Sequence, residues 1–282
     1  MTTDRRQLAA LLSWYAEIGV DEAVAAAPVD RFAASAAAPA PSPAARPLQA
    51  PRPRAADGVP DAVPPSALPA TPAVLGARQA AAGAATIEEL VAAIAAFEGC
   101  ALKKTATTTC VFDGNPAARV MLIGEAPGRE EDRQGKPVVG PAGKLLDRML
   151  AAIGLDRGSV YITNTIYWRP PGNRTPTPDE VASCLPFLER QVEILEPALL
   201  VYVGGSAAKA MLERSEGITR LRGKWFSFER EGRRPIPATA IFHPAFLLRQ
   251  PARKRETWRD LLAIRARLAE LGIHPGPTSP ES

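Results

Sequence analysis

The residues best suited to chemistry gather in three short segments, each of which follows an apolar run. The first, GEAPGREED (residues 124–132), has two glycines and a proline that allow a tight turn with exposed backbone N–H groups. Its acids are Glu125, Glu130, Glu131 and Asp132. They could belong to a functional site, or they could mark a helix start at which the dipole favours negative charge. A phosphate-binding loop is excluded, because GPAGKLL has leucine where that motif needs a hydroxyl.

The second segment, FHPAFLLR (residues 242–249), places His243 directly after an apolar run. A lone histidine there is often structural, but an apolar pair, Leu247 and Leu248, and a cation, Arg249, follow it. A hydrogen-bond donor, an apolar wedge and a cation are the parts needed to push a base out of a duplex and hold neighbouring phosphates. This loop therefore indicates a nucleic-acid site.

The third segment, TNTIYWRPPGNRTP (residues 163–176), sets Tyr167 and Trp168 at the start of a proline-rich loop. Proline donates no ladder hydrogen bond, so the preceding strand must end there. Two large aromatic side chains at that point could stack on a ligand, fill a space in the core or form a partner surface.

The elements that must position these loops alternate along the chain. Apolar runs at residues 118–124, 159–166 and 198–205 predict buried strands, and residues 224–244 predict two more strands around a Glu-Gly turn. The segments between them have helical spacing, as do residues 244–271. This alternation predicts an α/β fold with a mostly parallel sheet between helices, in which functional residues gather beyond the carboxyl ends of the strands.

Composition divides the rest of the chain. Residues 31–80 contain 17 alanines and 11 prolines, so we predict a linker over 29–84 after a short amphipathic helix within 1–28. The globular domain is expected at 85–273, with a capping box at Thr86 and Glu89, and a tail at 274–282. A polar N-terminus and short apolar runs predict no membrane segment, and the three sparse cysteines fit a reducing compartment, the bacterial cytoplasm or nucleoid. We expect a monomer.

The net charge of +4 is mild, but basic residues cluster near the C-terminus: Arg249, Arg253, Lys254, Arg255, Arg259, Arg265 and Arg267. Such a cluster is either a solvated helix face or a contact with nucleic acid.

Together the three segments resemble family 4 uracil-DNA glycosylases in order and spacing, from about Phe97 to Leu271. The resemblance implies the uracil-DNA glycosylase fold, with a central four-stranded sheet, and hydrolysis of the N-glycosidic bond of deoxyuridine in DNA at the start of base excision repair. It implies that Asn164 pairs with the uracil edge and that His243 donates to uracil O2. Glu125 and Glu131 both match pocket positions, and the sequence leaves open which one orients water.

The resemblance also assigns further contacts. Backbone N–H groups near Ala126 and Gly128 would hold the base or a phosphate. The expected DNA contacts are Arg169 and Arg174 in the proline-rich loop, a wedge of Leu247 and Leu248, and Arg249 on a phosphate.

Two departures from the family pattern stand out. Val138 occupies the position of a phenylalanine that stacks on uracil, which bears on substrate affinity. The four positions of the family's iron–sulfur ligands are Phe97, Cys100, Trp168 and Cys184, so only two thiolates remain, and Cys110 has no counterpart. A [4Fe-4S] cluster normally needs four ligands, so we expect no cluster, no metal and no other cofactor.

Two alternatives remain, one in the same fold and one of a different functional class. Val138 would permit a glycosylase for another deaminated base, and a module that binds uracil or abasic DNA without turnover is a second possibility. Glu125, Asn164 and His243 argue against the binding module. The N-terminal helix could bind a repair or replication protein or dock within the molecule.

Overall fold

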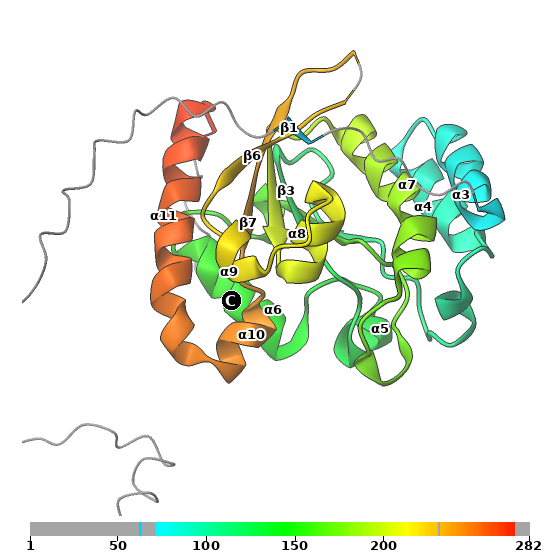
Figure 1. Cartoon of the computed structure of the whole chain (residues 1–282), viewed down its shortest axis with the longest axis horizontal. Helices are drawn as coiled ribbons and strands as arrows, with labels where there is room; N and C mark the ends of the chain where they lie inside the picture. Colours follow the sequence, from blue (N-terminus) through cyan, green and yellow to red (C-terminus); the bar gives the residue numbers. More distant parts are fainter. Residues whose placement is uncertain (1–61, 64–70, 231, 274–282) are drawn as a thin grey trace, which may run out of the picture. The chain divides into compact units, whose positions relative to one another are not determined.

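The computed structural model describes residues 62–63, 71–230 and 232–273, all within one compact unit (58–282) (Figure 1). The predicted N-terminal helix, most of the predicted linker and the tail lie outside the described residues. The strands are β1 (Ala62–Val63), β2 (Phe112–Gly114), β3 (Val120–Gly124), β4 (Tyr161–Asn164), β5 (Leu199–Val203), β6 (Trp225–Phe228) and β7 (Ile236–Ile241). Within the described residues, no helix is long and apolar enough to cross a membrane.

The helices follow the strands in the predicted alternation. They are α3 (Pro72–Ala82), α4 (Ile87–Ala96), α5 (Arg129–Gln134), α6 (Gly140–Ala151), α7 (Pro178–Leu195), α8 (Gly205–Leu212), α9 (Ile218–Leu221), α10 (Pro244–Arg249) and α11 (Lys254–Glu270). Short 3-10 turns are η1 (Ala101–Lys104), η2 (Arg157–Ser159), η3 (Pro171–Asn173) and η4 (Pro251–Arg253). The segment expected to be helical over 244–271 is interrupted at Gln250 and Pro251, because proline disfavours helical geometry in the residue before it.

The sheet has the order β1-β6-β7-β5-β3-β4-β2. Its centre, β7-β5-β3-β4, is parallel throughout, which confirms the predicted four-stranded parallel sheet. β2 and β6 extend it in antiparallel pairing, and β1 pairs with β6. In the β3–β4 ladder Gly124 lies opposite Asn164, so the ends of these two strands meet at one edge.

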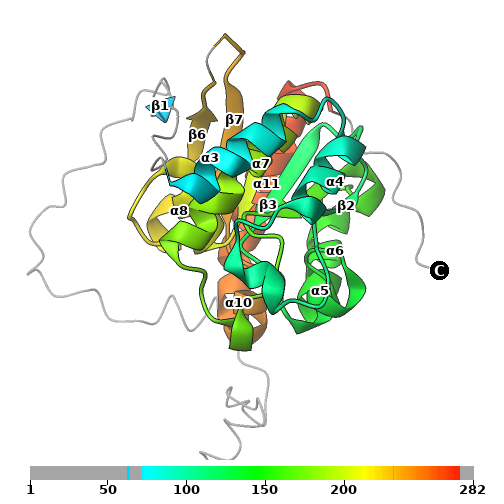
Figure 2. The same ribbon diagram turned by 90° about the vertical axis from the view of Figure 1, so that its right-hand side faces the viewer.

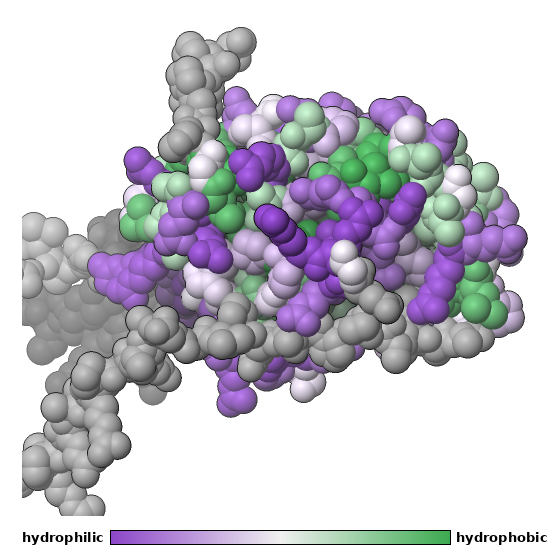
Figure 3. All heavy atoms as spheres, turned by 90° about the horizontal axis from the view of Figure 1, so that it is seen from above, coloured by the Kyte–Doolittle hydropathy of each residue, from purple (hydrophilic) through white to green (hydrophobic). Residues whose placement is uncertain are grey.

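Helices cover both faces of the sheet, as the apolar strands require (Figure 1 and Figure 2). Alternate residues of β3 show this directly, since Met121 and Ile123 join one core cluster and Val120 and Leu122 join another. The first cluster packs against α7 and α8, and the second against α6 and α11. The end of the sheet away from α5 and α10 is mainly hydrophilic, with smaller apolar areas (Figure 3).

The predicted start of the globular part, near residue 85, is too late. Residues 72–82, placed in the linker, form α3, which packs on α7 through small side chains such as Ala77 and Ala81. Thr71 caps the helix and Pro72 begins it, and Arg190 of α7 donates two hydrogen bonds to the carbonyl of Ala84. The prediction failed because the alanine and proline content was averaged over fifty residues. Residues 72–82 have one proline, at the helix start, and their alanines favour a helix that packs closely.

Candidate active site

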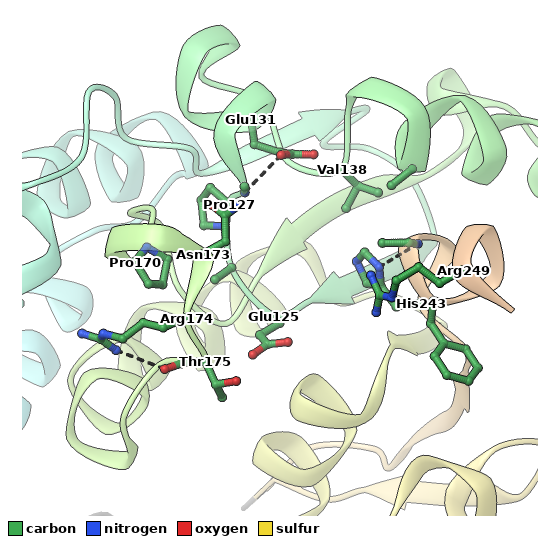
Figure 4. A pocket seen from close by; sticks show the side chains of 15 residues that line it. Glu125, Pro127, Glu131, Val138, Pro170, Asn173, Arg174, Thr175, His243 and Arg249 are labelled. Carbon is green, nitrogen blue, oxygen red and sulfur yellow. Dashed lines mark hydrogen bonds between the residues drawn. The ribbon is translucent and has the colours of Figure 1, made fainter.

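A pocket of about 400 Å³ opens at the carboxyl ends of the parallel strands, where the three segments meet (Figure 4). It lies beyond β3, β4 and β7, as expected for functional loops of a parallel sheet. Its lining consists of Glu125, Ala126, Pro127, Gly128, Glu131, Val138, Ala142, Pro170, Asn173, Arg174, Thr175, His243, Ala245, Phe246 and Arg249. The structure thus brings most of the predicted site residues to one place.

The two candidate glutamates have different environments. Both carboxylate oxygens of Glu131 accept backbone hydrogen bonds, Oε2 from Gly128 N at 3.0 Å and Oε1 from Val139 N at 2.9 Å. Glu131 therefore caps the start of α5 and connects it by a hydrogen bond to the loop before α6. The Glu125 side chain has no hydrogen-bond partner in the described part of the chain, and it lies half-buried on the pocket wall. Its backbone is fixed instead, because its carbonyl accepts from Ile166 N and Thr165 Oγ1.

Asn164 lies behind this wall rather than in it. Its side chain is 1% exposed, and Nδ2 has no hydrogen-bond partner within the described residues. Leaving a buried amide unpaired lowers the stability of the fold by about 1–3 kcal/mol. Nδ2 is therefore a donor that a bound ligand could satisfy. Asn164 is not among the lining residues. It pairs with Gly124 in the β3–β4 ladder, and Gly124 directly precedes Glu125 of the pocket lining.

His243 is the N-cap of α10, and its side chain is held in one orientation. Nδ1 accepts a hydrogen bond from Ala245 N at 3.1 Å, which leaves the proton of the neutral ring on Nε2. Burial, together with the nearby Arg249, lowers the pKa of His243 to about 4. Room for the ring comes from Gly204 at the end of β5, whose φ is +105° and where a Cβ would approach His243 Cβ to 3.1 Å.

Val138 adopts φ +50°, a left-handed conformation that is strained for a β-branched residue. Its side chain is buried at the pocket, and its carbonyl accepts from Arg157 Nη2 at 2.6 Å. Arg157 is itself held by Asp113 and Asp147, at 2.6 and 2.8 Å. The surrounding ion pairs therefore hold a strained valine at the position where the family pattern has a phenylalanine.

The proline-rich loop supplies the opposite wall through Pro170, Asn173, Arg174 and Thr175. Arg174 forms a two-pronged ion pair with Glu180 of α7, with N–O distances of 2.9 and 2.6 Å. Figure 4 shows its side chain directed away from Glu125. Arg169 donates to Asn173 Oδ1 at 2.7 Å. Both arginines predicted to contact DNA thus brace their own loop.

The two leucines expected to form a wedge, Leu247 and Leu248, differ in exposure. Leu247 is 1% exposed and packs in the core beneath α10, so the prediction that it is a wedge is wrong. Consecutive residues of a helix point in different directions, and Leu248 is therefore the exposed one, at 45%. Arg249 lies beside it, exposed at the pocket rim.

The residues at the family's cluster positions do not fit a cubane cluster. Trp168 is buried, packs edge-on against Tyr167 and donates from Nε1 to Thr109 Oγ1 at 3.1 Å. Phe97 packs edge-on against Phe187. Cys100 and Cys184 are buried free thiols, and a hydrogen bond from Cys184 lowers the pKa of Cys100 to about 7. Among the described residues, no group of three or more metal-ligating side chains comes together.

The third cysteine has a structural explanation. Cys110 donates from Sγ to the carbonyl of Glu131 at 3.1 Å, so it helps to hold the start of α5. Burial raises the pKa of this thiol to about 11.

The profile of the uracil DNA glycosylase superfamily matches residues 111–262, which include all three loops and every residue of the pocket lining. The chain is a member of the uracil-DNA glycosylase superfamily. It is 42% identical over 183 residues to the type-4 uracil-DNA glycosylase of Archaeoglobus fulgidus, a match that covers 64% of this chain and 92% of that protein.

Other members of the superfamily give a similar result. The type-4 uracil-DNA glycosylase of Thermotoga maritima is 42% identical over 53% of this chain and 77% of its own length. The type-5 uracil-DNA glycosylase of Thermus thermophilus is 31% identical over 56% of this chain and 79% of its own length. The chain therefore groups with the type-4 uracil-DNA glycosylases.

Several residues of the lining were missed at the level of sequence. They are Pro127, Ala142, Pro170, Asn173, Thr175, Ala245 and Phe246. Most lie in the three segments, so their neighbourhood was a usable signal. Ala142, at the start of α6, had none, because a small apolar residue in a helix looks the same whether it faces a pocket or a core.

Proposed function

We propose that this chain is a uracil-DNA glycosylase that hydrolyses the N-glycosidic bond of deoxyuridine in DNA and so begins base excision repair. The observation that carries the proposal is that one pocket joins Glu125, whose carboxylate is unpaired among the described residues, to a neutral, oriented His243. Membership of the superfamily and the type-4 relatives support it. The flipped deoxyuridine would enter this pocket, because the glycosidic bond cannot be reached inside a duplex.

His243 would stabilise the leaving base. As the bond breaks, negative charge develops on uracil O2, and a fixed N–H donor lowers the energy of that charge. Because Ala245 N donates to Nδ1, the ring can present Nε2–H to O2 without turning. A pKa of about 4 keeps the ring neutral near pH 7, so it donates as an imidazole.

Glu125 would act on the sugar side. The deoxyribose becomes cation-like in the transition state, and a nearby carboxylate both stabilises that charge and orients the attacking water. Glu125 is available for this role because its carboxylate makes no hydrogen bond with the described residues. Glu131 is a positioning residue, since Gly128 and Val139 already use both of its oxygens.

Asn164 would read the base. Its Nδ2, which has no partner among the described residues, can donate to a uracil carbonyl, whereas cytosine presents an amino group at the corresponding ring position. Bound cytosine would leave buried polar groups of the site unpaired, so the site should reject cytosine strongly. Backbone N–H groups near Ala126 and Gly128 would hold the base or a phosphate, Leu248 would replace the extruded nucleotide, and Arg249 would bind a phosphate.

The reaction would proceed without an iron–sulfur cluster. Two of the four family ligand positions hold Phe97 and Trp168, whose rings make core contacts instead. Purified protein should therefore show no absorbance band near 400 nm and no stoichiometric iron. Iron bound at full occupancy would overturn this part of the proposal.

Val138 favours one alternative, a preference for another deaminated base, because the pocket lacks the aromatic face expected there. Stacking contributes about 1–3 kcal/mol per base, so Val138→Phe should lower the KM for uracil-containing DNA about tenfold. Turnover of hypoxanthine or mismatched thymine without uracil release would favour the alternative.

The deciding experiment is a cleavage assay on single- and double-stranded oligonucleotides that contain uracil, hypoxanthine or mismatched thymine. Uracil release by the wild type, lost in Glu125→Gln and His243→Ala while DNA binding persists, is the expected result. Tight binding of uracil DNA without turnover would instead identify a binding module.

A further inference from the structure

A second hollow, of about 260 Å³, lies between α6, α10 and α11; we call it the α6–α11 groove. Its lining consists of Leu145, Arg148, Met149, Ala152, Leu247, Lys254, Thr257, Trp258 and Leu261. Side chains from all three helices thus form a largely apolar floor. The groove shares only α10 and α6 with the active-site pocket, and no lining residue is common to both.

The apolar surface continues outside the groove. Trp258 is 45% exposed at its rim, and Leu262, one helical turn further along α11, is 41% exposed. They are two of the four large hydrophobic side chains that are exposed within the described residues. An exposed tryptophan and leucine beside an apolar hollow are typical of a protein interaction site, at which such side chains anchor a partner.

The two charged residues that line the groove are both basic. Arg148 and Lys254 line it, and Lys144 and Arg255 lie within one turn of them on the same helices. All four side chains are exposed and make no ion pair with the described residues. The acids on the neighbouring turns of α11 are already paired, since Glu256 binds Arg253 and Asp260 binds Arg222.

From this complementarity we propose that the α6–α11 groove binds an acidic peptide segment of a partner protein, with apolar side chains in the groove and carboxylates on its basic rim. The apolar floor favours a peptide over the DNA backbone, because phosphates and sugars offer no side chain to fill a hollow formed by leucine, methionine and alanine. The basic rim selects acidic over neutral apolar peptides and speeds their association.

The position of α10 gives the groove a link to the active site. Ala245, Phe246 and Arg249 face the pocket, whereas Leu247, between them, faces the groove. A peptide bound in the groove would therefore lie beside the helix that carries the exposed Leu248 and Arg249. Such a partner would be held next to the surface that we expect to meet DNA.

The test uses the full-length protein and a short fluorescein-labelled peptide that alternates Asp with Leu and ends in Phe. Fluorescence anisotropy should detect saturable binding that weakens as salt is added. Replacing the aspartates by Asn, or the apolar residues by Ser, should weaken binding about tenfold in each case, because both features are needed. The indole N–H resonance of Trp258 in a ¹⁵N spectrum should shift on titration.

Variants of the protein locate the site. Trp258→Ser and the double variant Arg148→Glu with Lys254→Glu should each weaken peptide binding about tenfold, since one removes the anchor and the other reverses the rim. Leu75→Ser on α3 and Lys209→Glu on α8 are matched exposed controls that should leave the affinity unchanged.

Any of three results would overturn the proposal. The first is equal affinity for the Asp and Asn peptides, and the second is equal affinity of the control and groove variants for the Asp peptide. The third is that the groove variants lose affinity for a single-stranded oligonucleotide while the peptide does not bind, because Trp258 would then be a stacking platform for bases.

Discussion

Gly124 and Asn164 are packed so closely that the two residues constrain each other. A Cβ at Gly124 would lie 2.3 Å from Asn164 Oδ1. The two residues are also partners in the β3–β4 ladder, at the point where both strands end. The glycine therefore lets the buried amide occupy the place from which it would read the base.

Gly124→Ala should reduce uracil release at least about tenfold, because the added methyl forces the Asn164 amide to turn away. Folding should be affected less, since the group that must move is the end of a side chain. Thermal melting and single-turnover kinetics would separate the two effects. Gly83→Ala is the matched control, because its Cβ would make only ordinary contacts, the nearest at 3.6 Å. Normal kinetics for Gly124→Ala would show that Asn164 does not read the base.

Glu125→Gln and Glu131→Gln should have different consequences. The first should lower the single-turnover rate by about a hundredfold or more with an unchanged melting temperature, because the side chain makes no structural hydrogen bond with the described residues. The second should lower the free energy of unfolding by about 1–3 kcal/mol, since an amide can accept at only one of the two positions that Gly128 N and Val139 N require. Its activity should fall as well, because it positions the loop.

The opposite pattern, with Glu131→Gln fully stable but inactive and Glu125→Gln fully active, would reverse the two roles. Denaturant unfolding and uracil release measured on the same preparations decide between them.

His243 should make stability depend on pH between about 4 and its ordinary pKa of 6.5. In that range the unfolded chain binds a proton that the folded chain does not, so stability rises with pH. The contribution of the neutral His243 ring to stability is fully present above pH 6.5, the pKa in the unfolded chain. It is lost as the pH falls through about 4, the pKa in the folded chain. His243→Asn replaces the Nδ1 acceptor for Ala245 N by an amide oxygen that does not titrate, so the difference between wild type and variant isolates this effect. A difference curve that is flat across this range would contradict the assignment.

Trp168→Ala should lower the free energy of unfolding by about 3–5 kcal/mol, because the indole fills a buried space and its hydrogen bond to Thr109 would be lost. Denaturant unfolding measures the loss. Trp258→Ala, at an exposed position, is the control and should cost much less. A small effect at Trp168 would mean that the space at the family's cluster position is not part of the packed core.

The sequence was sufficient for the parallel sheet and for the three loops of the site. Apolar runs such as residues 118–124 are typical of strands buried on both faces of a parallel sheet, and parallel strands bring the loops after them to one edge. Local composition did not predict α3. Its alanines resembled those of a linker, because their packing on α7 depends on residues about a hundred positions away.

The amino-acid sequence by itself determined which residue types reach the pocket, including Glu125, Glu131 and His243. Only the tertiary structure decided what each is free to do. Glu131 accepts a hydrogen bond from Val139 N and Arg174 is paired with Glu180, whereas Glu125 is unpaired within the described residues. The reason is physical, because availability depends on hydrogen bonds and burial, and these are set by which distant segments the fold brings together.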